Sequence, residues 1–166
     1  MSTECNSSFV IMTNTKGEIL LNRDAREHEH GLGKLNYPGG GISMGEHPVE
    51  AAVRETGEES GREILAQNLT IVGMYTMRKS YGIVFLYAHM EPVGEAHPLH
   101  ECDEVTEKCW ILPEKVIQLP DTEIYPAQRT LTRYYLQWLR DGQKKQESVQ
   151  FLSPPFEITG KYFDGL

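Results

Sequence analysis

The amino-acid sequence predicts an α/β fold in which helices pack on a mixed β-sheet. Apolar, β-branched runs of strand length occur at residues 8–12, 69–77 and 82–90. A segment with helical periodicity lies between these runs, at residues 48–61, and a second one follows them at residues 125–140. Because groups of strands alternate with helices along the chain, layers of helix around a sheet are the favoured architecture.

The first predicted element is a strand at residues 8–12, followed by a turn at residues 14–17 and a second strand at residues 19–21. We expect these two strands to form a hairpin, because Asn-Thr-Lys-Gly is typical of a turn between paired strands. Residues 24–34 are polar and contain glycine, which predicts a loop. Three consecutive glycines, at residues 39–41, then interrupt the chain.

The helix that follows has an apolar side of small residues, which suits packing against a sheet. Pro48 is compatible with a first helical turn, where its missing N–H has no helical partner in any case, and Gly61 is a suitable C-terminal stop. Thr56 stands at the centre of the buried side, and we expect its hydroxyl to donate to the Ala52 carbonyl.

The second half of the chain is predicted to contain two paired strands, at residues 69–77 and 82–90. A long acidic loop is expected at residues 91–108, followed by a short strand at residues 109–111 and the last helix. Residues 143–166 lack a clear period and are expected to form a tail.

Length and composition are those of a single domain. The 166 residues include 39% hydrophobic and 24% charged side chains, which is enough apolar surface for a core. We expect one domain over residues 1–166, with its core at about 7–142. The longest apolar run, near residues 83–88, is far shorter than the ~20 residues that span a bilayer, so no membrane segment is expected.

Charge and cysteine content exclude several classes of protein. There are 16 Lys and Arg against 24 Asp and Glu, and the net charge of −8 disfavours non-specific binding of DNA or RNA. A small phosphate ligand remains compatible, because a bound divalent metal reverses the local sign of the charge. Cys5, Cys102 and Cys109 form no CxxC pair, and no signal peptide is visible. We therefore expect a reducing, cytoplasmic location.

Three carboxylates are predicted to share one face of the first helix. Glu55, Glu58 and Glu59 stand at i, i+3 and i+4, with Glu59 beside the apolar side and Glu58 furthest toward solvent. Such groups repel one another unless a cation offsets their charge, and Arg54 alone cannot neutralise all of them. All-oxygen ligands favour Mg²⁺ or Mn²⁺ over zinc, which predicts a site for a metal-bound diphosphate. The alternative is a solvated, charged helix face.

The segment from residue 40 to residue 62 resembles the Nudix box, G-x5-E-x7-R-E-U-x-E-E-x-G-U, in which U is a bulky aliphatic residue. Its fixed positions are all present, as Gly40, Glu46, Arg54, Glu55, Glu58, Glu59 and Gly61. Thr56 and Arg62 depart from the pattern, because each stands where an aliphatic residue is usual. Arg62 is expected near the helix C-terminus, where the helix dipole favours a cation.

The resemblance implies an α/β/α sandwich around a mixed sheet. It also implies a Mg²⁺-dependent hydrolase, with Mn²⁺ as a substitute, that cleaves the diphosphate linkage of a small nucleoside diphosphate derivative. The implied metal ligands are Glu55, Glu58, Glu59 and a backbone carbonyl, for which we select Gly40. Glu55 is implied as a further ligand or as the base that activates water, Arg54 as the residue that orients Glu55, and Glu46 as a brace of the loop.

Many members of the family add a carboxylate from a later loop. Glu101, Asp103 and Glu104 all lie in a suitable acidic segment, and we favour Glu104 as a catalytic residue. A solvated acidic loop is the alternative.

Substrate contacts are expected outside the box. Guanidinium groups match phosphate oxygens and an aromatic ring can stack on a base. The candidates are Arg23, Arg26, Arg78 and Tyr37. Each of them is also compatible with an ordinary surface or core position.

Two kinds of function remain in competition. The favoured one is the hydrolase, and the other is a non-catalytic Nudix-fold sensor that binds a nucleotide or metabolite without cleaving it. All box carboxylates are retained, which favours hydrolysis. The expected partner is a small-molecule diphosphate, and the sequence leaves the identity of this compound and a homodimer open.

Overall fold

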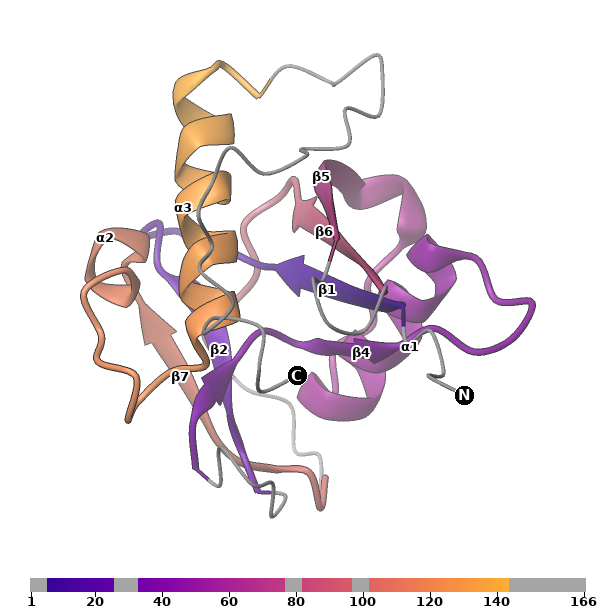
Figure 1. Ribbon diagram of the computed structural model, residues 1–166, viewed down its shortest axis with the longest axis horizontal. Helices are drawn as coiled ribbons and strands as arrows, with labels where there is room; N and C mark the ends of the chain where they lie inside the picture. The colour runs from indigo at the N-terminus through magenta and orange to yellow at the C-terminus, as the bar shows by residue number, and fades with distance from the viewer. Residues whose placement is uncertain (1–5, 26–32, 77–81, 97–101, 144–166) are drawn as a thin grey trace.

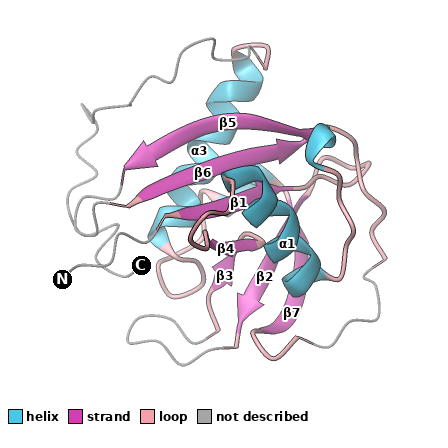
Figure 2. Cartoon of the chain, turned by 90° about the vertical axis from the view of Figure 1, so that its right-hand side faces the viewer, coloured by secondary structure: helices cyan, strands magenta, loops and turns pink. Residues whose placement is uncertain are grey.

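Strands form two β-sheets that lie between helices on opposite sides in the computed structural model of this chain (Figures 1 and 2). The structure describes residues 6–25, 33–76, 82–96 and 102–143. The strands are β1 (Ser7–Ile11), β2 (Ile19–Asp24), β3 (Leu35–Asn36), β4 (Gly39–Gly41), β5 (Leu69–Thr76), β6 (Ile83–His89) and β7 (Val105–Ile111). The helices are α1 (Pro48–Ser60), the 3₁₀ helix η1 (Ala66–Asn68), α2 (Pro113–Val116) and α3 (Pro126–Arg140).

Both sheets combine strands that are far apart in the sequence. The first has the order β4-β1-β6-β5 and the second the order β3-β2-β7. β1 runs parallel to β6 and antiparallel to β4, while the pairs β5–β6, β2–β3 and β2–β7 are antiparallel. The predicted α/β class, with helices around a mixed sheet, is therefore confirmed.

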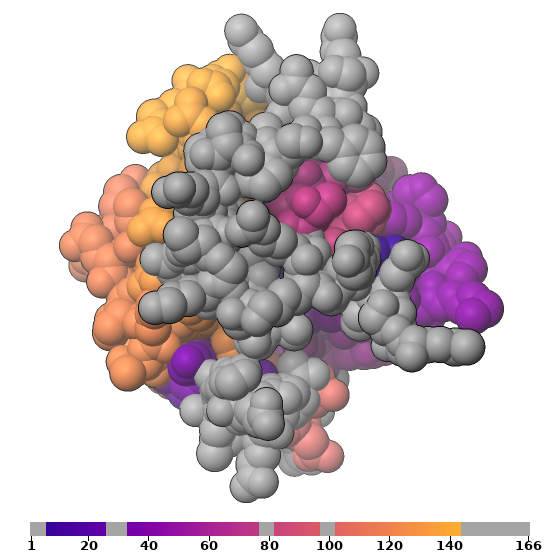
Figure 3. All heavy atoms as spheres, viewed as in Figure 1, coloured from indigo at the N-terminus to yellow at the C-terminus, as the bar shows by residue number. Residues whose placement is uncertain are grey.

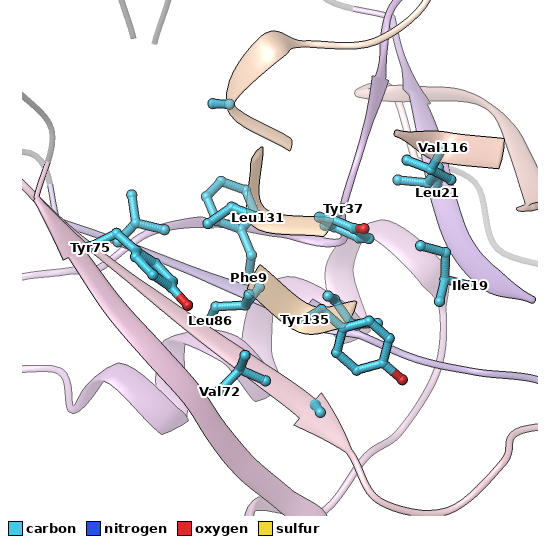
Figure 4. Close-up of a cluster of buried hydrophobic side chains, with 14 of the residues drawn as sticks. Phe9, Ile19, Leu21, Tyr37, Val72, Tyr75, Leu86, Val116, Leu131 and Tyr135 are labelled. Carbon is cyan, nitrogen blue, oxygen red and sulfur yellow. The ribbon is translucent and has the colours of Figure 1, made fainter. Parts of the chain in front are cut away.

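Two hydrophobic cores explain why helices cover both faces. Alternate side chains of a strand point to opposite faces, and β1 is apolar on both. Phe9 and Ile11 lie in one core with Leu131 of α3, whereas Val10 belongs to the other core with Ala52 of α1. Figure 4 shows the first of these cores. In the space-filling view, α2 and α3 lie at the edge opposite the chain that leads into α1 (Figure 3).

The predicted hairpin of the first two strands is wrong. The turn forms, and the Asn14 side chain accepts hydrogen bonds from the backbone N–H groups of Lys16 and Glu18. Beyond a single bridge between Thr13 and Ile19, however, β1 and β2 separate into different sheets. The turn residues determine only the reversal of the chain, whereas the pairing of each strand depends on distant partners.

The predicted start of the strand that became β7 is also wrong. The strand begins at Val105, earlier than the predicted Cys109, and its first residues are partly or largely exposed. β7 lies at the edge of its sheet, where a strand can carry polar side chains. These polar residues give the segment a composition that is also typical of a loop.

The long helices and the middle strands are confirmed. α1 and α3 begin within a residue or two of the predicted positions, and β5 and β6 pair as predicted. The short elements β3, β4, η1 and α2 were not predicted. None of the helices in the described part of the chain has the length and apolar character needed to cross a membrane. Almost all of the expected tail, residues 144–166, lies outside the described residues.

Candidate active site

Helix α1 is fixed at both ends, and this determines where its carboxylates lie. His47 is the N-cap, and its Nδ1 atom accepts a hydrogen bond from Val49 N while Glu50 accepts one from His47 N. This reciprocal arrangement is a capping box. At the other end Gly61 adopts a φ of 70°, and its N–H donates to the Gly57 carbonyl. A residue with a Cβ rarely adopts this left-handed conformation, which explains the stop at glycine.

Glu59 is the buried carboxylate of the helix, and its side chain points toward both sheets. Its Oε2 atom accepts hydrogen bonds from Gly39 N, at 3.1 Å, and from Asn22 Nδ2, at 3.2 Å. Burying a carboxylate is costly unless donors satisfy its oxygens, and these two donors satisfy Oε2. The helical wheel correctly placed Glu59 beside the apolar side, since only 4% of the residue is exposed.

Glu55 lies one turn earlier, against the glycine strand β4. A Cβ atom at Gly40 would stand 2.6 Å from the Glu55 carboxyl carbon, so only glycine allows this approach. Burial raises the pKa of Glu55 above its ordinary value, and hydrogen bonding to Arg54 opposes that shift. The nearby charges of Glu58 and Glu104 raise this pKa further.

Arg54 connects three carboxylates. Its Nη1 atom donates to Glu55 Oε1 at 2.8 Å and to Glu58 Oε2 at 3.1 Å. Its Nε and Nη2 atoms donate to both oxygens of Glu46, at 2.8 and 3.0 Å, and Nη2 also donates to the Gly41 carbonyl. These bonds raise the pKa of Arg54, chiefly through Glu46, so the guanidinium is always charged.

Glu46 is held between Arg54 and the loop that precedes the helix. Its Oε2 atom accepts a hydrogen bond from Ser43 N at 2.9 Å. The bonds from Arg54, followed by the one from Ser43, lower the pKa of Glu46 to about 2. The contacts of Glu46 are those expected of a residue that braces this loop.

The donor chemistry at this end of α1 fits a hard divalent cation. Glu55, Glu58 and Glu59 offer only carboxylate oxygens, which Mg²⁺ and Mn²⁺ prefer. The raised pKa of Glu55 means that an added positive charge would stabilise its ionised form. Within the described residues, however, no three His, Cys, Asp or Glu side chains already converge on a common point. Arg54 instead supplies positive charge to Glu55 and Glu58.

Two residues that were predicted to contact the substrate, Arg23 and Tyr37, do not lie at these carboxylates. Arg23 follows Asn22 in β2, so it points to the opposite face of the strand from Glu59. Its guanidinium is bound to Glu107 at 2.7 Å and to the Gly33 carbonyl at 2.5 Å.

The prediction that the Tyr37 ring stacks on a base of the substrate is wrong. It is fully buried in the core beside Leu131, and its hydroxyl shares a 2.5 Å hydrogen bond with Thr132 (Figure 4). Leu35 and Tyr37 are buried whereas Asn36 between them is half-buried, so the chain that continues from β3 directs the Tyr37 side chain inward. Arg26, Arg78 and Glu101 lie outside the described residues.

The acidic segment before β7 is partly described. Asp103 and Glu104 are both exposed, and the Glu104 carbonyl accepts a hydrogen bond from Ala25 N at 2.9 Å. The charge of Glu104 contributes to the raised pKa of Glu55.

Sequence reasoning missed Asn22 and Lys108. Asn22 holds Glu59, and Lys108 stands directly opposite Asn22 in β7 and donates from Nζ to the Ser60 carbonyl at 3.1 Å. Lys108 thus supplies the cation at the C-terminus of α1 that was expected from Arg62. Neither residue carries a local signal, because both reach the helix only through the pairing of β2 with β7.

The hydroxyl of Thr56 does not bond to the Ala52 carbonyl, as had been expected. It is buried without a hydrogen-bond partner among the described residues, while Ser60 Oγ donates to the Thr56 carbonyl. The helix is intact despite this cost, since its ends are capped.

Parts of this chain are similar in sequence to known proteins. A protein of Bifidobacterium longum, described as a nucleoside triphosphate pyrophosphatase/Nudix hydrolase fusion protein, is 30% identical over 101 residues. The match covers 59% of this chain and 20% of that protein. The 8-oxo-dGTP diphosphatase of Escherichia coli is 47% identical over 51 residues, covering 31% of this chain and 39% of the enzyme. The chain therefore spans less than half the length of either relative.

The fold is shared with solved structures. The MutT protein from Methanosarcina mazei superposes with a TM-score of 0.66 at 24% identity, covering 84% of this chain and 96% of that one. The family model of the NUDIX domain matches residues 5–135, which is more than half of the sequence and includes the whole box. The chain belongs to the NUDIX domain family.

Proposed function

We propose that this protein is a Mg²⁺- or Mn²⁺-dependent hydrolase that cleaves the diphosphate linkage of a small nucleoside diphosphate derivative. The observation that carries the proposal is the position of two carboxylates against the glycine strand. Glu55 lies against Gly40 and Glu59 accepts from Gly39 N, so two of the box carboxylates lie beside the backbone of β4. The names of the two curated relatives support a nucleotide substrate.

The proposed metal ligands are Glu55, Glu58 and Glu59, together with the carbonyl oxygen of Gly40. When bound, the cation screens the charge of the diphosphate oxygens and lowers the pKa of a coordinated water. Asn22 and Gly39 N fix one oxygen of Glu59, which orients its carboxylate before any ligand binds.

Glu55 is the proposed general base. Its burial raises its pKa, which makes the carboxylate a better proton acceptor than an exposed glutamate. Arg54 holds Glu55 Oε1 at 2.8 Å and is itself held by Glu46, so the base is oriented by a chain of charged contacts. Glu104 is proposed as the additional carboxylate, supported by its exposed position directly before β7 and by its charge, which contributes to the raised pKa of Glu55.

The decisive experiment is a panel of nucleoside diphosphate derivatives, assayed for released phosphate products with Mg²⁺, Mn²⁺ or EDTA. We expect hydrolysis of at least one compound, loss of activity in EDTA, and a rate at least ~10²-fold lower in Glu58→Gln. Glu114→Gln, on the exposed side of α2, is the matched control and should retain the parent rate. Full activity in EDTA would refute the metal, and Mn²⁺ binding without turnover of any compound would favour a sensor.

We also propose a reducing, cytoplasmic compartment. The free thiols of Cys102 and Cys109 support it, because an oxidising compartment favours paired cysteines. A disulfide at either residue in protein isolated from its own cells would contradict this location.

A further inference from the structure

Asn22 is a buried polar residue in the middle strand of its sheet. It lies in β2, between β3 and β7, and only 2% of it is exposed. Its direct neighbours across the sheet are Asn36 in β3 and Lys108 in β7. Alternate residues of a strand share a face, so Leu20 points the same way, and it lies in the core beneath α1. An apolar side chain at residue 22 would extend this core, so burial alone does not explain an asparagine there.

The contact with Glu59 determines how the amide of Asn22 is oriented. An ionised carboxylate only accepts hydrogen bonds, so Nδ2 must face Glu59, to whose Oε2 atom it donates at 3.2 Å. The Oδ1 atom of Asn22 then faces elsewhere, and it is buried without a hydrogen-bond partner in the described part of the chain. An unsatisfied buried acceptor lowers the stability of a fold. One end of the amide is therefore unfavourable for folding, and what the other end provides is a donor to Glu59.

Donors from both sheets hold the same oxygen of Glu59. Gly39 N, in β4 of the first sheet, donates to Oε2 at 3.1 Å, while Asn22 donates to it from the second sheet. The first donor is a backbone N–H, which every residue except proline supplies. Of the two donors, only Asn22 depends on the identity of its side chain.

We propose that Asn22 is a positioning residue, which fixes the orientation of the Glu59 carboxylate and thereby sets the affinity of the site for its divalent cation. The inference rests on the proposed function, which assigns Glu59 as a metal ligand. Side chains that hydrogen-bond to a metal ligand orient it, and their loss lowers metal affinity by about 10- to 100-fold. Glu58 differs from Glu59, since its side chain is 59% exposed and it pairs with Arg54 of the same helix. The effect of Asn22 is therefore specific to Glu59.

The affinity of the full chain for Mn²⁺, measured from the electron paramagnetic resonance of the free ion, tests this inference without substrate. Asn22→Leu keeps the approximate size and shape of the side chain but removes the donor, and we expect it to raise the Kd by about 10- to 100-fold. Asn22→Val suits a strand and also lacks a donor, so it should show a similar loss. Asn36→Leu, at the neighbouring position in β3, is the matched control and should keep the parent Kd. Parent affinity in both Asn22 variants, or an equal loss in Asn36→Leu, would overturn the proposal.

A double-mutant cycle identifies the ligand through which Asn22 acts. In a Glu59→Gln background, Asn22→Leu should cost little further affinity for Mn²⁺, because the ligand that it orients is already lost. In a Glu58→Gln background, the same substitution should retain its full cost. Equal costs in the two backgrounds would mean that Asn22 does not act through Glu59, and this result would also overturn the proposal.

The proposed function and the role of Asn22 fail in different ways. A parent that binds Mn²⁺ but hydrolyses no compound refutes the proposed function, whereas the binding data still decide the role of Asn22. Hydrolysis by the parent, with unchanged Mn²⁺ affinity in both Asn22 variants, refutes the role of Asn22 alone. A parent that binds no Mn²⁺ refutes both.

Discussion

At the scale of single residues, Arg54 determines the electrostatics of the site. Its guanidinium binds both oxygens of Glu46 while it also reaches Glu55, a geometry that requires several donors in a fixed plane. Lysine keeps the charge but has no such fork. We expect Arg54→Lys to lower kcat/KM by about 10- to 100-fold, since each lost bond between charged groups is worth about 1.5–3 kcal/mol. Steady-state kinetics measure this, with Arg133→Lys on the exposed side of α3 as the control, and equal rates in parent and Arg54→Lys would contradict it.

Glu46 gives the metal-free protein a pH-dependent part of its stability. Its pKa is lowered from 4.5 to about 2, so its contribution is complete above its unfolded pKa and is lost as the pH falls toward 2. We therefore expect Glu46→Gln to be less stable than the parent at neutral pH, with a difference that narrows below about pH 5. Thermal unfolding in EDTA across this pH range is the measurement. A difference that stays constant or widens in acid would contradict the role of Glu46.

Residue-level predictions from the sequence were accurate where a position depends on one helix alone. The helical wheel placed Glu59 beside the apolar side of its helix, and its side chain is buried there. Asn22 could not be found in this way, because it meets Glu59 only after β2 has been placed beside α1. Tyr37 failed for a related reason, since its burial depends on α3, which contributes Leu131 and Thr132 from far along the chain.

At the scale of elements, the C-terminus of α1 depends on a cation from a strand. The last turn of the helix has no basic residue, and Lys108 Nζ donates to the Ser60 carbonyl from β7. We expect Lys108→Met, which keeps the apolar stem, to reduce stability by about 0.3–2 kcal/mol. That change corresponds to a Tm lower by roughly 1–8 °C for a domain of this size. Calorimetry measures it against Lys115→Met on α2, and equal Tm values for the two variants would contradict the assignment.

Elements were predictable to the extent that their signals are local. α1 has a capping residue, a proline at N1 and a terminal glycine within its own sequence, and it was located almost to the residue. β7 was placed too late because an edge strand can carry Thr106, Glu107 and Lys108 without losing its hydrogen bonds to β2. The prediction that β1 pairs with β2 was wrong, because the apolar sequence of a strand does not specify which other strand lies beside it in the sheet.

At the scale of the whole molecule, the two cores share strands and should unfold together. β1 and β6 send alternate side chains into both cores, so neither core can lose its packing without exposing the other. One tryptophan is associated with each core, because Trp138 lies in the core beneath α3 and Trp110 is partly buried against the core beneath α1.

Urea unfolding of Trp110→Phe and Trp138→Phe therefore follows one core at a time by fluorescence. Each substitution lowers the stability by its own amount, so each variant is also followed by far-UV circular dichroism as an internal reference. We expect the fluorescence and dichroism midpoints to coincide within each variant, because a small domain with interleaved cores unfolds in one cooperative step. A fluorescence midpoint in Trp138→Phe that precedes its dichroism midpoint would mean that the layer of α1, with its carboxylates, unfolds separately. The site would then lie on the less stable half of the molecule rather than on a framework shared by both sheets.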